Sequence, residues 1–252
     1  MDEERLSSAM VGAMRRRTLA VGGGEVLDVD GVLLLLTGLP DPSLNHCVVE
    51  REPADAVAAL EEAEARFAER GLPFGVRLEV GRHPSVEAAV RARGLHRLFG
   101  RPIMTAPLGE LPALAPPWEV EIVRVHGDAD LAALAAIETE VFETPRAAAQ
   151  GLLCRGLAEL PDAALLLARL DGEPVGEAFG IRQDDTVGVL GVGVVPRARM
   201  RGIGGALTVE AARAVGLPED TAWLFPSDLA RPLYERLGFR PVLDEEVWIR
   251  EA

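Results

Sequence analysis

The chain has 252 residues, of which 48% are hydrophobic, so it is long and apolar enough for one large domain or two of ordinary size. Its formal net charge of −14 disfavours a nucleic-acid partner, because binding to phosphates requires a basic surface. All 26 basic residues are arginine, and the lack of lysine excludes both a P-loop and Schiff-base catalysis.

The cysteines and the N-terminal sequence predict the compartment. Cys47 and Cys154 lie far apart without metal-ligand spacing, as expected of reduced thiols, and no metal site is predicted. The first residues, MDEERLSSAM, lack the basic-then-apolar order of a signal peptide. The apolar run GVLLLLTGL is too short to cross a bilayer. We expect a cytoplasmic protein with no membrane partner, and the sequence leaves its oligomeric state open.

The first half of the chain alternates strand and helix signals. Apolar residues at helical spacing with a stop at Gly71 favour a long helix, and turn residues between β-rich runs favour a hairpin before it. The expected elements are a hairpin over 24–38, a helix over 53–72, a strand over 74–80, a helix over 85–95 and a strand over 96–108. A proline-rich segment at 106–120 follows, and it predicts two domains, at 1–112 and 117–252.

The second half predicts a longer series of alternating elements. A strand at 119–125 is followed by a helix that begins at Asp128 and runs through about Phe142. A second helix is expected near residues 146–158, starting after Pro145. The remaining elements are strands over 163–170, 173–183 and 186–196, a helix ending at Gly216, a strand over 221–226, a helix over 229–238, and strands over 239–243 and 246–250. This order predicts an α/β (α+β) fold.

The stretch PRARMRGIGGAL, residues 196–207, is an unusual way to begin a helix. Gly202, Gly204 and Gly205 each weaken the helix, and three arginines, Arg197, Arg199 and Arg201, lie just before them. Helix N-termini carry unpaired amides and a partial positive charge, and glycine lets an anion approach them. The stretch therefore indicates a phosphate site rather than a plain glycine turn, although it lacks the Rossmann spacing.

Two motifs carry a resemblance to the GNAT N-acetyltransferase superfamily. Val194-Val195-Pro196 followed by Arg199-Met200-Arg201-Gly202-Ile203-Gly204 is similar to its V-x-P, R-x-x-G-x-G/A signature for acetyl-CoA. The stretch LYERLGF, 233–239, resembles its downstream helix, in which a tyrosine precedes a Gly-Phe pair and a small residue, here Ala230, lies one turn earlier. The order of elements over 117–252 is also similar.

The resemblance implies a mixed, mostly antiparallel sheet flanked by helices, with acetyl-CoA as co-substrate. By resemblance, the backbone of Val192 and Val194 would bind the pantetheine arm, Gly193 would suit the strand bulge, and loop amides would hold the pyrophosphate. Ser227 stands where the superfamily often has an asparagine. The implied cofactor-binding residues are Val192, Gly193, Val194, Arg199, Met200, Arg201, Gly202, Ile203, Gly204, Gly205 and Ser227.

The implied reaction is direct transfer of the acetyl group to a primary amine of a small molecule or protein. Tyr234, the only tyrosine, would donate a proton to the departing thiolate, the alternative being a core tyrosine. No general base stands out: Glu177, Asp228, Glu143 and bound water are the candidates, and a solvent-facing position is the simpler expectation for Glu177.

The first half loosely echoes the second. AAVRARGLHRLFG resembles PLYERLGFRPV, with Val90 where Tyr234 stands and no R-x-x-G-x-G upstream. The chain thus resembles tandem GNAT proteins with a degenerate N-terminal half. Two alternatives stay open: a non-catalytic CoA-binding regulatory module, and an acyl donor longer than acetyl-CoA.

Overall fold

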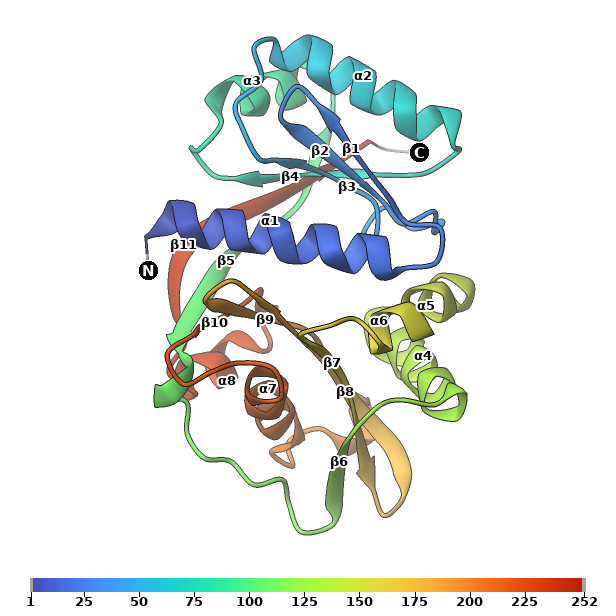
Figure 1. Cartoon of the computed structure of the whole chain (residues 1–252), viewed down its shortest axis with the longest axis vertical. Helices are drawn as coiled ribbons and strands as arrows, with labels where there is room; N and C mark the ends of the chain where they lie inside the picture. The colour runs from blue at the N-terminus through green and yellow to red at the C-terminus, as the bar shows by residue number, and fades with distance from the viewer. Residues whose placement is uncertain (1, 251–252) are drawn as a thin grey trace.

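The computed structural model describes residues 2–250, and its strands join one continuous sheet that passes through both halves of the chain (Figure 1). The strands span Glu25–Val29 (β1), Val32–Leu36 (β2), His46–Val49 (β3), Gly75–Glu79 (β4), His96–Pro107 (β5), Val120–Arg124 (β6), Ala163–Leu170 (β7), Glu173–Gln183 (β8), Thr186–Val194 (β9), Thr221–Leu224 (β10) and Arg240–Ile249 (β11). Their order is β1-β2-β3-β4-β11-β5-β10-β9-β8-β7-β6. Among the strands of the described residues, only the β3–β4 and β9–β10 pairs are parallel, so the predicted mixed, mostly antiparallel sheet is confirmed.

Helices flank this sheet in both halves. They span Glu3–Ala20 (α1), Ala56–Glu69 (α2), Pro84–Ala92 (α3), Asp128–Phe142 (α4), Arg146–Leu152 (α5), Arg155–Ala158 (α6), Ile203–Arg213 (α7) and Arg231–Arg236 (α8), with single 3-10 turns at Leu108–Glu110 and Pro196–Ala198. The helix expected after Pro145 is divided, because Leu153 and Cys154 leave helical geometry between α5 and α6.

The two halves exchange their last strands. β11, the final strand of the chain, lies between β4 and β5 and so enters the sheet of the first half. In the same way β5 lies between β11 and β10 and completes the sheet of the second half. Backbone hydrogen bonds therefore join the halves in both directions, which fixes their relative position.

The prediction of two C-terminal strands was wrong, because residues 240–249 form one strand with a register shift between Pro241 and Leu243. The acidic residues in its middle resemble a loop in sequence. In the fold they face arginines of the neighbouring strands: Glu245 bonds Arg77 at 2.8 Å and Arg101 at 3.2 Å. These partners are far away in sequence, so no local pattern announces them.

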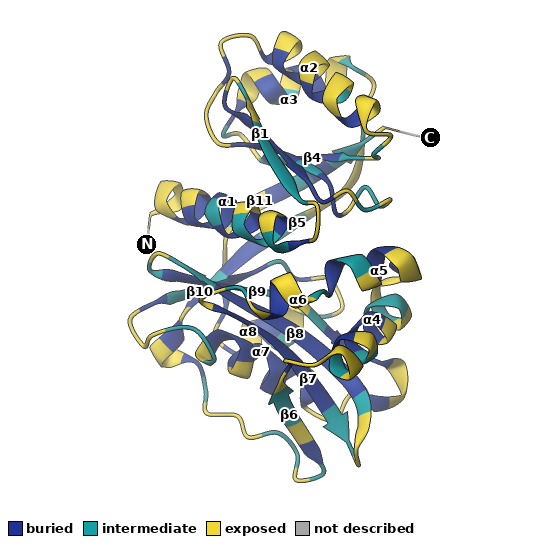
Figure 2. Cartoon of the chain, turned by 45° about the vertical axis from the view of Figure 1, so that its right-hand side comes forward, coloured by how far each residue is buried: buried dark blue, intermediate teal, exposed yellow. Residues whose placement is uncertain are grey.

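Helix α1 was not among the predicted elements, and it lies between the two halves (Figure 1). Asp2 caps its first turn by accepting a hydrogen bond from the Arg5 amide at 2.9 Å. A stripe of buried residues runs along it: Leu6, Met10, Val11, Ala13, Met14 and Thr18. This stripe packs between the two halves, whereas the opposite face of α1 carries exposed residues (Figure 2).

Two apolar cores support this arrangement. A smaller core lies under α2 and α3 in the first half, around Phe67, which stacks on Phe74 at 4.6 Å between ring centroids. A larger core includes α1 and the second half, with Trp223 fully buried at its centre. None of the helices within residues 2–250 is both long and apolar enough to cross a membrane.

Candidate functional site

The parallel strands β9 and β10 separate partway along their length. Their pairing ends at Gly188 opposite Trp223, whereas β9 continues to Val194. Beyond that point one edge of β9 has no strand beside it in the described part of the chain. Apart from the Val194 carbonyl, which accepts a hydrogen bond from Arg199, backbone groups on this edge are available to an extended ligand, in line with the prediction for Val192 and Val194.

A β-bulge interrupts β9 within this open segment. Across the pair with β8 the register jumps from Phe179–Leu190 to Glu177–Gly193, and Gly191 adopts φ +57°. The bulge was expected at Gly193, and that expectation was wrong. Gly193 is small for another reason: a Cβ there would meet Phe142 of α4 at 3.0 Å. The bulge glycine is Gly191, whose positive φ favours glycine.

The loop before α7 has the features of an anion cradle. Gly202 is the N-cap with φ +81°, and no side chain caps the helix. In the described residues no acceptor is found for the amides from Met200 to Gly205. A Cβ on Gly204 or Gly205 would meet only ordinary contacts at 3.5 Å or more. The chain's own packing thus does not require glycine at these two positions, but a diphosphate approaching the amides would.

The three arginines of this stretch differ in their roles. Arg197 pairs with Glu140 at 3.1 Å and donates to the Pro174 carbonyl. Arg199 Nε donates to the carbonyl of Val194 at 3.0 Å, which holds the loop against the end of β9. Arg201 is exposed and has no such bond among the described residues. Two of the arginines therefore shape the loop while adding positive charge beside it.

Tyr234 lies on α8, which packs against the start of α7. Its side chain is buried, and its hydroxyl is hydrogen-bonded with Thr208 of α7. Burial raises the pKa of Tyr234 to about 12, so the phenol keeps its proton at neutral pH. Ser227 is exposed, and its hydroxyl accepts a bond from the Ala230 amide at 3.3 Å, which caps the turn into α8.

Glu177 is buried, so a solvent-facing position was the wrong expectation for it. It points from β8 to the face that carries α1 and α4, because residues on the other face, such as Gly180, approach α7. Burial, together with the charge of Glu138 and a hydrogen bond to it, holds the pKa of Glu177 well above its ordinary value. The other base candidates, Asp228 and Glu143, are exposed.

Glu177 and the bulge line the same cavity, which we call the carboxyl cavity. Its lining includes Arg17 of α1, Glu138 of α4, Glu177, Leu190 and Gly191. Thr144 holds Glu138 in place by donating to it at 2.9 Å. The carboxyl of Glu177 therefore faces the strand segment beside which the sequence predicts the acyl group.

Arg17 and Glu138 were missed by the sequence analysis. Arg17 continues the spacing of Met10 and Met14 on α1, so an arginine on an apolar helical stripe was the available signal. It could be used only after the N-terminal segment had been recognised as a helix.

Residues 161–241 match the family model of the acetyltransferase (GNAT) domain. The whole chain is similar in structure to a GCN5-related N-acetyltransferase from Kribbella flavida, with a TM-score of 0.76 and 23% identity, covering 99% of this chain and 95% of that one. A GCN5-related N-acetyltransferase from Sphaerobacter thermophilus gives a TM-score of 0.63 at 18% identity, covering 99% and 94%. A tandem GNAT protein from the clavulanic acid biosynthesis pathway gives 0.57 at 16%, covering 87% and 78%. No curated protein matches the chain.

These matches confirm the predicted resemblance. Residues 161–241 match the GNAT domain by sequence, and the chain as a whole has the fold of GNAT N-acetyltransferases, including a tandem one. Within residues 2–250 there is no cluster of three or more His, Cys, Asp or Glu side chains that could hold a metal ion.

Proposed function

We propose that the protein is an N-acetyltransferase that transfers the acetyl group of acetyl-CoA to a primary amine. One observation carries the proposal: the uncapped helix start at Gly202, the free edge of β9 and the buried carboxyl of Glu177 lie along one path. The path offers an anion cradle, a strand edge and a titratable group in the order in which a diphosphate, a pantetheine arm and an acyl group follow one another in acetyl-CoA.

In this proposal the loop from Arg199 to Gly205 binds the diphosphate through its amides, and Ser227 contacts the cofactor from the start of α8. The edge of Val192 and Val194 bonds the pantetheine arm. The side chain of Arg199 already occupies the Val194 carbonyl, so the arm would use the amide there. Acetyl-CoA supplies a thioester, whose carbonyl would lie beside the Gly191 bulge.

Glu177 is the proposed general base. The nitrogen of a neutral amine forms a bond to the thioester carbon, the carbon–sulfur bond breaks, and the amine proton passes to Glu177. A raised pKa brings this carboxyl closer to neutral pH, where a base is most effective. Tyr234 would donate a proton to the departing thiolate and recover one from solvent.

A non-catalytic CoA-binding module is the second candidate, and a specific observation favours it. The Tyr234 hydroxyl already interacts with Thr208 inside the protein, which is typical of a structural tyrosine. A longer acyl-CoA is a variant of the first proposal, since the loop would bind only the carrier.

Calorimetric titration of acetyl-CoA, with free CoA and a longer acyl-CoA as comparisons, followed by an amine panel, tests these proposals. We expect one site per chain and release of free thiol with at least one amine. Tight binding without turnover on any amine would favour the regulatory module, and no binding would contradict both.

A further inference from the structure

Helix α1 brings the first half of the chain to the proposed acceptor site and is fixed on both sides. Arg16 Nη1 donates to the carbonyl of Arg182 on β8 at 2.6 Å. On the other side, Ser7 donates to Glu79 at the end of β4 at 2.6 Å. Side chains on the buried stripe of α1 therefore have defined positions between the halves.

Arg17 has neither a hydrogen bond nor an ion pair within 4 Å among the described residues. Burial lowers its pKa, and the charge of Glu138 only partly opposes this. It borders two cavities. One is the carboxyl cavity; the other, which we call the arginine cavity, lies between α1 and the first half's sheet. The arginine cavity is lined by Met14, Arg17, Thr18, Val21, Leu35, Thr37, Ser43, Leu44, His46, Arg77 and Leu152. Arg17 therefore lies between the carboxyl cavity, which is lined by Glu138 and Glu177, and the arginine cavity, which is also lined by Arg77.

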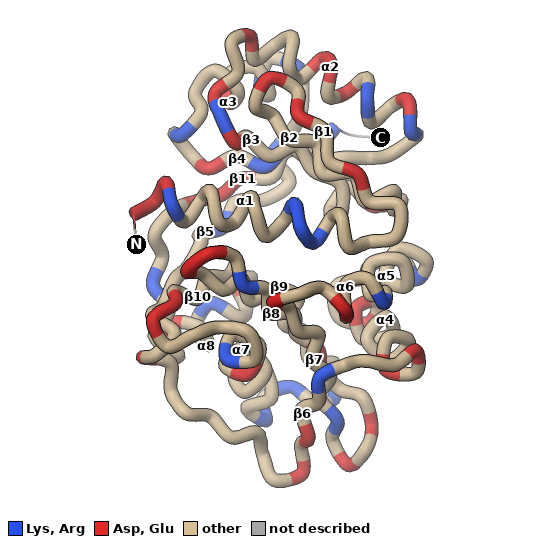
Figure 3. Tube along the Cα trace, viewed as in Figure 1, with Lys and Arg blue, Asp and Glu red and all other residues tan. Residues whose placement is uncertain are grey.

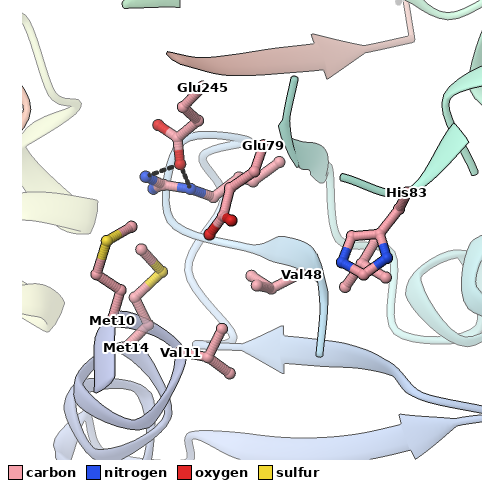
Figure 4. A pocket seen from close by; sticks show the side chains of 9 residues that line it. Met10, Val11, Met14, Val48, Glu79, His83 and Glu245 are labelled. Atoms are coloured by element: carbon pink, nitrogen blue, oxygen red, sulfur yellow. Dashed lines mark hydrogen bonds and ion pairs between the residues drawn. The ribbon is translucent and has the colours of Figure 1, made fainter. Parts of the chain in front are cut away.

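The surroundings of the arginine cavity carry more positive than negative charge. Arg77 and Arg101 share a single carboxylate, that of Glu245, at 2.6 and 3.2 Å. Glu79 lies nearby, but it is paired with Arg82 at 3.5 Å. Glu138 attracts Arg17 from the carboxyl cavity. Figure 4 shows Glu79 and Glu245 on the far side of a neighbouring pocket, opposite Met10 and Met14 of α1.

Such an excess is unexpected in a chain with a net charge of −14. The basic stretch of α1 that contains Arg17 lies between the halves, away from the acidic outer segments (Figure 3). A partly buried guanidinium without a partner is unfavourable unless a counter-charge joins it. A bound anion would supply that counter-charge to Arg17. The hydroxyls of Thr37 and Ser43, which also line the cavity, already donate to Asn45 and Asp41.

We infer that the arginine cavity binds an anionic group of the acceptor, so that the acceptor is a small amine that also carries a carboxylate or phosphate. The inference rests on the proposed function for the amine end, which would lie in the carboxyl cavity beside Glu177. Each of the two cavities has a volume of only about 30 Å³, which suits the polar end groups of a small molecule rather than a segment of a protein.

The test compares anionic amines with neutral counterparts in wild type, Arg17→Met and Arg17→Lys. The probes are the common α-amino acids and β-alanine against their carboxamides, and phosphoethanolamine against ethanolamine. Each is assayed for acetylation and, without acetyl-CoA, for ligand-induced thermal stabilisation, which reports binding alone. Arg15→Met is the matched control, because Arg15 is exposed on the same helix.

We expect wild type to prefer anionic probes, and Arg17→Met to raise KM for them by about tenfold to a hundredfold, the value of one or two charge-assisted hydrogen bonds. Arg17→Lys should keep part of this preference, and the loss on neutral probes should be much smaller than the loss on anionic ones. Acetyl-CoA binding and the Arg15→Met protein should be unaffected. The preferred anion, carboxylate or phosphate, identifies the chemical source.

Failure of the inference can be told apart from failure of the proposed function. Arg17-dependent stabilisation by anionic probes without any acetylation would leave the anion site standing and remove the enzyme. Equal use of anionic and neutral amines, equal losses on both in Arg17→Met, or no stabilisation by any anionic probe would overturn the inference.

Discussion

The two halves begin their main crossover helices in opposite ways. In the first half Asp55 caps α2, accepting hydrogen bonds at 3.0 Å from the amides of Val57 and Ala58. In the second half Gly202 occupies the corresponding position before α7, and no side chain bonds the amides. One helix satisfies its own N-terminus and gains stability, whereas the other leaves it open to a ligand.

The strands that precede these two helices also differ, in how much of their edge is left without a neighbouring strand. β3 ends at Val49, one residue after its last pair with β4, so the first half has almost no free strand edge. In the second half β9 continues from Gly188 to Val194 beyond its last pair. The same topology is thus present twice, but only the second copy has both an open helix and an open strand. We propose that the first half is a degenerate domain that shapes the acceptor site and binds no cofactor.

The largest effect is expected from placing an acidic side chain at the N-terminus of α7, where α2 has Asp55. Gly204→Asp places a carboxylate in the cradle, and a Cβ fits there without a clash. We expect acetyl-CoA affinity to fall by roughly a hundredfold or more, because like charges meet at the amides. Calorimetry measures the loss, and Gly204→Asn separates charge from size.

The fold should survive this change, since glycine is replaced by a better helix former. Unfolding curves of both variants check this point. If Gly204→Asp binds acetyl-CoA as wild type does, the cradle lies elsewhere.

The second test concerns Glu177, whose strand pairs with the open segment of β9. Glu177→Gln should lower kcat by about 10²–10⁴, the range for loss of a general base, with acetyl-CoA affinity unchanged. In wild type kcat/KM should rise with pH through the raised pKa of Glu177, and the variant should lose this rise. A variant with normal kcat and an unchanged pH profile would remove Glu177 from the mechanism.

The raised pKa of Glu177 also makes the free energy of unfolding depend on pH. Because its pKa is higher in the folded state, its stabilising contribution is complete below the pKa of the unfolded chain. That contribution is lost as pH rises through the folded-state value. The free energy of unfolding of Glu177→Gln, measured in denaturant, should therefore fall less than that of wild type towards alkaline pH. Parallel pH dependences would show that the burial of this carboxyl has no energetic effect.

The two halves also differ in the helix that precedes their last strand. Tyr234 lies on α8 in the second half, whereas the fully buried Val90 occupies the matching position on α3 in the first half. Tyr234→Phe should lower kcat about tenfold to a hundredfold and leave acetyl-CoA affinity within twofold. With a pKa of about 12, wild-type Tyr234 stays protonated below that pH, so no activity loss from its ionisation is expected near neutrality. Unchanged kcat in stopped-flow and steady-state assays would assign Tyr234 to the core.

Sequence predicted the parts of this molecule that depend on neighbours in the chain. The glycine loop, the strand before it and the helix after it are recognisable because turn residues and periodicity act within a few positions. The strand β11 was divided in two because its acidic centre is stabilised by Arg77 and Arg101, which precede it by more than 140 residues.

The acceptor side was hidden for the same reason. Glu177 looks like a surface residue on an alternating strand until α1, from the other end of the chain, covers it. The bulge was assigned to Gly193 because several glycines alternate along β9, and only the register with β8 selects Gly191. Cavities made by residues from both halves cannot be found from either half alone.

The smallest effect is expected from removing the side chain that caps α2 in the first half. Asp55→Ala removes the cap of α2 and should lower stability by about 1 kcal/mol, seen as a Tm decrease of roughly 2–4 °C. Acetyl-CoA stoichiometry should stay at one per chain, because the short β3 still offers no strand edge for a pantetheine arm. Thermal unfolding and calorimetry on the same sample measure both quantities. A second acetyl-CoA site in this variant would mean that Asp55 alone closes the first half, and that its missing strand edge is unimportant.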